Sequence, residues 1–479
     1  MFHTNSLKKN GVFNAIKTLM SVLFPLITFP YASRILGPSG IGKVNFASSI
    51  VSYFLMLAML GISNYGIREA GRYRNDKEKL SKFVKEILSI NLISSVIAYT
   101  FLFASIYLVP AFFEYRKLII ISSASILFTV VGVEWLFYAM EDLVSVSIRS
   151  FIFQILSLVL LFVFVRTSED YINYALIGVV SSVGSNILSF IFASRYVDFK
   201  SKNIIELKQH LKPIFVFFMM SVAATVNSSI DITMLGFISG ADEVGYYSAA
   251  LKVVRLVAAV VASFTVILPR LSYYASAGEN ENFKILSTKT LDANMLLAIP
   301  ACIGMMSLSK NIIYVLSGTQ YENSIRVLHI LSFTVFLLTI SNLCGAHMLL
   351  ALGKEKVTFY AVLIGIFFNI ATNLILIKRY GAYGAGIATL ASEFTVSVIE
   401  FFCVKKYFIW KDILKNLFQT VCSALIMALI VFAIIKTDFP IITSLVLSIF
   451  AGAFSYFIVL LILRNELLYE FVRRMRWSK

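Results

Sequence analysis

Apolar stretches of roughly 20 residues alternate with short polar segments along the whole chain. A helix of about 20 residues rises about 30 Å, which matches the hydrocarbon core of a membrane. A transmembrane β-barrel would instead show short segments of alternating hydrophobicity. The pattern therefore predicts an all-α polytopic membrane protein.

Hydropathy predicts about 14 transmembrane helices. The first apolar stretch follows a basic flank without a small-residue cleavage site, so we expect a retained helix rather than a signal peptide. No loop between spans is long enough to form a separate soluble domain. The predicted spans are approximately 12–35, 43–65, 86–109, 118–140, 149–166, 172–194, 213–238, 245–269, 291–316, 325–350, 357–377, 384–404, 416–436 and 441–463.

Composition and charge agree with this topology. The 479 residues are 59% hydrophobic and 14% charged, whereas soluble domains are about a quarter charged. An even number of spans places both termini on one side, and about 29 of the 42 Lys and Arg residues fall on that side. The positive-inside rule then predicts cytoplasmic termini, and it explains the net charge of +16 better than nucleic-acid binding does. The four cysteines lack metal-ligand spacing, so we expect no metal site and no cofactor.

An internal repeat relates the two halves of the chain. The stretch "ILGPSGIGKVNFASS" (35–49) resembles "MLGFISGADEVGYYSAALK" (234–252), with Gly37 matching Gly236 and Gly42 matching Gly245. The offset spans six predicted helices, and an even number implies a parallel pseudo-twofold repeat. We therefore predict an N-lobe of helices 1–6 (residues 1–210) and a C-lobe of helices 7–12 (211–404). Two accessory helices and a basic cytoplasmic tail follow (405–479).

Repeats of this kind indicate a transporter that works by alternating access, with its substrate site between the lobes. Prolines inside apolar stretches would bend or interrupt the helices that carry them. Pro25 and Pro30 fall in the first predicted helix, and Pro300 falls in the ninth. We expect the first helix to bend at a lobe interface.

Several motifs resemble the polysaccharide-transporter family, the Wzx-type flippases of O-antigen and capsule repeat units in the multidrug/oligosaccharidyl-lipid/polysaccharide exporter superfamily. The resemblance covers most of the chain, with the same number and order of spans. The motifs that carry it are "RILGPSGIGKVNFA", "GISNYGIREAGRYRND", "DITMLGFISGADEVGYYSAALKV", "LAIPACIGMMSLSKNIIYVLSG" and "LLALGKEKVTFYAVLIGIFFNIATNLILIKRYGAYGAGIATLASE".

The resemblance implies a flippase of the bacterial cytoplasmic membrane, not an enzyme. Such a protein moves a polyprenyl-diphosphate-linked oligosaccharide from the inner to the outer leaflet for surface polysaccharide synthesis. Its implied partners are the lipid-linked glycan, the bilayer, and the polysaccharide polymerase and glycosyltransferases of the same pathway. The sequence has no GxxxxGK[ST] motif, so energy would come from an H+ or Na+ gradient or from consumption of the product outside.

Cationic side chains inside or at the ends of spans are the first site candidates, because a diphosphate needs a cationic cavity. Lys252 and Arg255 share a helix face, and Arg carries a planar fork suited to phosphate. Lys17 lies near the cytoplasmic end of the first predicted helix, from where it can also snorkel. Arg34 and Arg68 lie at span ends, and Arg68 can either meet the diphosphate or pair with Glu69.

Acidic and amide side chains supply the remaining candidates. Asp231 lies at the same predicted depth as Lys252, so we expect it to pair with Lys252 or Arg255 beside the cavity. Any one of four carboxylates would take a proton if burial raised its pKa, although buried ion pairs and interface positions are the more common explanations for such residues. These are Glu134, Asp292, Glu393 and Glu400. Intramembrane asparagines, among them Asn342, can bind sugar hydroxyls or join helices.

Alternatives stay open at this point. A peptidoglycan-precursor (lipid II) flippase shares the fold, and sequence separates the two poorly. A cation-coupled drug or metabolite antiporter of the superfamily usually has two fewer helices. A membrane-embedded polysaccharide polymerase or ligase would need a large external loop, whereas the longest here has only about ten residues.

Overall fold

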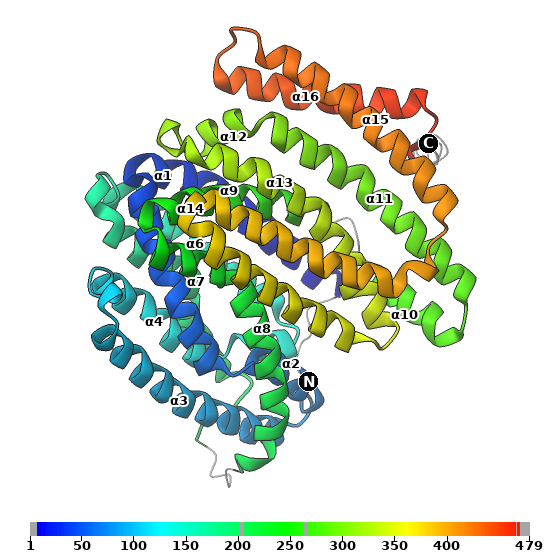
Figure 1. Ribbon diagram of the computed structural model, residues 1–479. Coiled ribbons are helices and arrows are strands. Elements are labelled where there is room, and N and C mark those ends of the chain that lie inside the picture. Colours follow the sequence, from blue (N-terminus) through cyan, green and yellow to red (C-terminus); the bar gives the residue numbers. More distant parts are fainter. Residues whose placement is uncertain (1–6, 201–205, 263–266, 466, 470–479) are drawn as a thin grey trace. The chain divides into compact units, whose positions relative to one another are not determined.

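The computed structural model describes residues 7–200, 206–262, 267–465 and 467–469, except for the side chains of residues 7–22 and 262. The described part is helical and contains no strand (Figure 1). The all-α expectation is therefore confirmed. The long helices are α1 (Leu7–Met59), α3 (Lys77–Leu108), α4 (Arg116–Gly132), α6 (Leu143–Phe164), α7 (Tyr171–Ala193), α8 (Lys208–Ile238), α9 (Ala241–Ala262), α11 (Asn280–Ser307), α13 (Asn323–Ser341), α14 (Glu355–Val404), α15 (Trp410–Ile435) and α16 (Ile441–Ile462).

Shorter elements connect or extend these helices. The short α-helices are α2 (Ile62–Arg72), α5 (Glu134–Ala139), α10 (Leu268–Ala277) and α12 (Ser309–Leu316). A π-helical segment, η4 (Asn342–Leu349), continues α13. The 3₁₀ turns are η1 (Pro110–Phe112), η2 (Ser168–Asp170), η3 (Thr319–Tyr321) and η5 (Lys405–Tyr407).

Two very long helices explain how the predicted number of spans arises. The described residues contain 12 candidate membrane spans, of which Leu23–Arg72 and Glu355–Tyr407 have 50 and 53 residues. A helix of 50 residues rises about 75 Å, more than twice the thickness of a hydrocarbon core. Each of the two contains a break, at Gly37 (φ 67°) and Gly381 (φ 52°). Each therefore supplies two crossings, and the expectation of about 14 spans is confirmed.

The break in α1 lies at a glycine between the first two predicted spans, 12–35 and 43–65. Helix α1 runs through Pro25 and Pro30, and its non-helical backbone is at Gly37, directly before Pro38. The positive φ of this turn is open to glycine without steric cost, while most other residues avoid it. Pro300 likewise lies inside an uninterrupted α11. The helix continues past each of these prolines, so none of them interrupts it, and a bend at them stays a prediction.

The chain forms two compact units, Met1–Gly245 and Tyr246–Lys479. In the first unit, α8 packs along α1, and aromatic side chains such as Trp135 and Phe83 fill a core beside them. In the second, α15 and α16 pack on α11, and the Tyr456 hydroxyl donates to the Leu296 carbonyl at 2.7 Å. The predicted lobes (1–210 and 211–404) are groups of helices expected to move together during transport. Compact units do not report such motion, so the division into lobes stays a prediction.

Candidate functional site

Polar side chains join α8 to the second half of α1. The Ser52 hydroxyl donates to Ser229 at 3.1 Å, and Tyr53 lies 3.2 Å from the Thr233 hydroxyl. Thr233 also reaches the buried Ser49 at 3.1 Å. These contacts bind the first helix of the second repeat to a helix of the first repeat.

The repeat glycines lie in the same region, and we call Gly42, Gly236 and Gly245 the glycine seam. A Cβ at Gly42 would overlap the backbone of Ala241, and one at Gly245 would overlap the backbone of Pro38. A Cβ at Gly236 would overlap the Phe46 ring. The two matching sequence segments therefore touch each other, at a spacing that only glycine permits.

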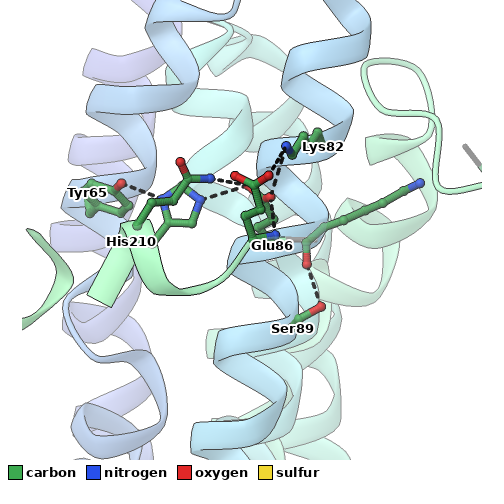
Figure 2. A network of polar contacts seen from close by, with 8 residues as sticks. Tyr65, Lys82, Glu86, Ser89 and His210 are labelled. Atoms are coloured by element: carbon green, nitrogen blue, oxygen red, sulfur yellow. Dashed lines mark hydrogen bonds and ion pairs between the residues drawn. The ribbon is translucent and has the colours of Figure 1, made fainter. Parts of the chain in front are cut away.

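A second set of contacts holds the other end of α8, and Figure 2 shows it as the Tyr65–His210–Glu86 network. His210, near the start of α8, places Nδ1 2.8 Å from the Tyr65 hydroxyl of α2. Its Nε2 lies 2.9 Å from the Glu86 carboxylate of α3. All three side chains are buried. One imidazole thus links three helices.

Glu86 is satisfied from several directions. It is 2% exposed and accepts the backbone N–H of Glu206 at 2.8 Å, while Lys82 lies 3.9 Å away. A neutral imidazole with its proton on Nε2 donates to Glu86 and accepts from Tyr65. A protonated imidazole donates on both sides, to the carboxylate and to the tyrosine oxygen. The network can therefore hold the start of α8 in either protonation state.

Arg68 lies next to this network and is paired. Its Nε donates to the Glu69 carboxylate at 2.9 Å, and Arg72 reaches the other carboxylate oxygen at 3.0 Å. The guanidinium also lies over the rings of Tyr65 and Phe217, at 5.7 and 5.1 Å from their centroids. The predicted pair of Arg68 with Glu69 is thus present. Half of the Arg68 side chain stays exposed and can make a further contact.

Sequence reasoning missed a buried arginine in the first unit. Arg149 on α6 is 5% exposed, and none of its three nitrogens has a hydrogen-bond partner within the described residues. Its guanidinium lies over Phe137 and Phe192, at 4.2 and 5.4 Å from the ring centroids. The hydropathy pattern puts Arg149 at the boundary of the predicted span 149–166, where a charged residue is ordinary. Its burial follows from the helix starting six residues earlier, at Leu143.

Loop contacts near α6 form a further polar group. The Tyr196 hydroxyl donates to Asp142, the residue before α6, at 2.9 Å. Burial, followed by the negative charge of Asp142, raises the pKa of Tyr196 to about 12. Tyr196 therefore stays a neutral donor at physiological pH and ties the end of α7 to the start of α6.

The predicted cations lie on three helices, α1, α2 and α9. Lys252 is half-buried and Arg255 is exposed, both on α9, and Arg34 is exposed on α1. The side chain of Lys17 lies outside the described residues. Asp231 is buried on α8, in the first unit, whereas Lys252 and Arg255 belong to the second. Their predicted pairing would join the two units, so it stays a prediction.

The four predicted carboxylates have different surroundings. Glu400 is fully buried, and one oxygen accepts the Ser341 hydroxyl at 2.6 Å while Oε1 has no hydrogen-bond partner in the described part. Asp292 is buried and accepts the Asn416 amide at 2.8 Å. Glu393 is half-buried on α14, and Glu134 begins α5. Glu400 is thus a fully buried carboxylate with one oxygen that can take up a proton.

A family profile described as "Polysaccharide biosynthesis protein" matches residues 7–275, more than half of the chain. The "Putative O-antigen transporter" of Escherichia coli (strain K12) is 24% identical over 407 residues, 84% of this chain and 97% of that protein. The "Capsular polysaccharide biosynthesis protein CapF" of Staphylococcus aureus is 23% identical over 410 residues, 84% of this chain and 100% of that protein.

The fold is similar to a solved structure of the lipid II flippase MurJ in an inward closed conformation. The TM-score is 0.77 at 18% identity, covering 95% of this chain and 99% of that chain. At this identity the likeness shows the fold alone, and it confirms the predicted fold class. The family resemblance of the sequence motifs is confirmed by the profile match. This multi-pass membrane protein belongs to the polysaccharide biosynthesis protein family.

Proposed function

We propose that the protein is a flippase for polyprenyl-diphosphate-linked oligosaccharides. It moves repeat units of O-antigen or capsule from the inner to the outer leaflet of the bacterial cytoplasmic membrane, with both of its own termini in the cytoplasm. It carries out no chemical step on the glycan. Glycosyltransferases supply the cargo, and a polymerase consumes it.

The observation that carries this proposal is the family match on a chain made mostly of helices long and apolar enough to cross a membrane. A polysaccharide biosynthesis protein made of such helices acts on the part of the pathway that lies in the bilayer. The chain matches an O-antigen transporter and a capsular polysaccharide biosynthesis protein over nearly the full length of these relatives. Both names fit a lipid-linked sugar as cargo.

The contacts of α8 suggest how access alternates. The glycine seam and the serine and threonine contacts hold one part of α8 on α1. The Tyr65–His210–Glu86 network holds the start of α8 on α2 and α3. We propose that these two sets of contacts are the two gates. One opens toward the periplasm and the other toward the cytoplasm, and α8 is released from one set at a time.

The cargo needs positive charge for its diphosphate. Lys252 and Arg255 are three residues apart on α9 and therefore share a face of the helix. We propose that this face binds the diphosphate, with Asp231 holding one of the cations until the cargo arrives. Arg68, beside the network, would meet the diphosphate during entry, and Arg34 and Lys17 would add positive charge along α1.

We propose H+ or Na+ coupling, with Glu400 as the principal site. A buried carboxylate with one unpartnered oxygen is stabilised when it takes up a proton. Glu400 also lies against η4, where a Cβ at Gly345 would overlap its carboxylate. π-Helical segments are rare, and those that occur are often at functional sites. Uptake of H+ or Na+ by Glu400 would thus act on η4. Asp292, Glu393 and Glu134 are secondary candidates for the coupling site.

Lipid II flipping is the second candidate function, because the fold is that of a lipid II flippase. A cation-coupled drug or metabolite antiporter and a polysaccharide polymerase or ligase have less support. Deletion of the gene separates these candidates. We expect loss of surface polysaccharide, with lipid-linked repeat units accumulating on the cytoplasmic side. Normal surface glycan in a strain without a second flippase would refute the proposal, whereas rescue of a strain depleted of its lipid II flippase would favour the second candidate.

A further inference from the structure

The second unit contains a cavity of about 360 Å³ whose lining is mostly apolar, with four polar side chains and no charged one among the described residues. Its walls come from α9, α11, α13 and the start of η4. A cavity of this size takes a small organic group rather than a few waters. The lining residues are Ala258, Ala259, Asn294, Leu338, Thr339, Ser341 and Asn342.

Two of the lining amides have unused hydrogen-bonding capacity. Asn294 is 3% exposed, and neither its amide nor that of Asn342 is given a side-chain hydrogen bond by the described residues. A buried amide without a partner costs free energy, so a ligand that supplies partners is favoured there. Each amide offers donors on its nitrogen and an acceptor on its oxygen.

The two hydroxyls of the lining are already committed as donors. Thr339 donates to the Val335 carbonyl at 2.7 Å, and Ser341 donates to Glu400 at 2.6 Å. Their oxygens therefore face a ligand as acceptors only, so the ligand must bring its own O–H or N–H groups. A phosphate brings none when fully ionised, and the described lining holds no Lys or Arg for it. A cationic ligand would need a carboxylate to pair with, and the described lining has none.

We infer that this cavity binds one neutral sugar ring of the lipid-linked glycan. Sugar hydroxyls are both donors and acceptors, which matches two free amides and two acceptor hydroxyls. The C–H face of the ring would lie against Ala258, Ala259 and Leu338, whose small or apolar side chains leave room for it. The inference rests on the proposed flippase function and adds a sugar site to it.

The position of the cavity along α9 agrees with such a cargo. Ala259 follows Arg255 by four residues, so the two share a helix face about 6 Å apart along the axis. A diphosphate at Arg255 would thus place the first sugars of the glycan next to the cavity. The charged and neutral parts of one molecule would contact adjacent parts of one helix.

Binding measurements on the full-length protein in lipid nanodiscs test the inference. The two probes are polyprenyl diphosphate alone and the same lipid carrying a neutral oligosaccharide. We expect Asn294→Ala and Asn342→Ala each to weaken binding of the glycosylated lipid about fivefold, because each removes about one net hydrogen bond. Binding of the bare lipid should not change. Asn311→Ala is the matched control, because that amide is buried in the same unit but bonds to Ser444 at 3.2 Å.

A second pair of variants covers the case in which an asparagine variant fails to fold. Ala259→Leu fills the cavity from an exposed position, whereas Val260→Leu adds bulk beside it on the same helix. We expect only Ala259→Leu to lose the preference for the glycosylated lipid. Equal effects of Ala259→Leu on both lipids, or none on either, would overturn the sugar site. If the wild type does not bind the glycosylated lipid, the proposed function falls as well.

Discussion

His210→Ala should weaken the hold of α2 and α3 on the start of α8. The imidazole bonds to the Tyr65 hydroxyl at 2.8 Å and to the Glu86 carboxylate at 2.9 Å, and both partners are buried. Leaving a buried polar group without its partner costs about 1–3 kcal/mol. Glu86 keeps the Glu206 N–H, so its loss is partial. We therefore expect a total of about 2–4 kcal/mol, a shift of roughly 30- to 900-fold toward the released state.

Distance measurements between two spin labels report this release directly. Phe215 on α8 and Leu92 on α3 are 62% and 44% exposed, so labels there do not enter the core. The four native cysteines are first replaced by alanine, and labels are then attached to cysteines at these two positions. The wild-type background should show a narrow distribution, to which His210→Ala adds a longer distance.

Tyr65→Phe is the graded control for this experiment. It keeps the imidazole on Glu86 and removes one neutral hydrogen bond, which is worth about 1 kcal/mol, or about a fivefold shift. Its longer-distance population should therefore lie between those of the wild type and His210→Ala. Identical distributions in all three proteins would refute the argument that the imidazole carries the hold on α8.

Gly42→Ala should destabilise the protein by about 1–3 kcal/mol, because its methyl group meets the Ala241 backbone, which cannot rotate away. Gly178→Ala, with open space at its Cβ, should leave thermal unfolding unchanged, and equal melting temperatures would contradict the close contact. Arg255→Ala should reduce glycan transport at least tenfold without lowering protein level; unchanged transport would remove this face of α9 from the diphosphate site. Glu400→Gln should preserve folding but abolish the dependence of transport on an ion gradient, whereas gradient-driven transport at the wild-type rate would exclude Glu400 as the coupling site.

The sequence alone determined that the chain crosses a membrane repeatedly as helices. Backbone N–H and C=O groups have no water to bond in a bilayer, so long apolar stretches must satisfy them within a helix. The same reasoning fixed the number of crossings, and the repeat identified Gly42 and Gly245 as equivalent. It also placed the break in α1, because Gly37, whose positive φ the turn needs, lies between the predicted spans 12–35 and 43–65.

Tertiary structure decided which polar groups meet. Glu86 and His210 are 124 residues apart in the chain, and no sequence pattern links a carboxylate on one span with an imidazole on another. Asn294 looks like any polar residue in an apolar stretch, and only the packing of α11 against α13 shows that it lines one cavity with Asn342. Apolar periodicity follows from each helix and its solvent, so it can be read locally. Polar contacts depend on how helices from distant parts of the sequence pack, and packing is fixed only in the folded chain.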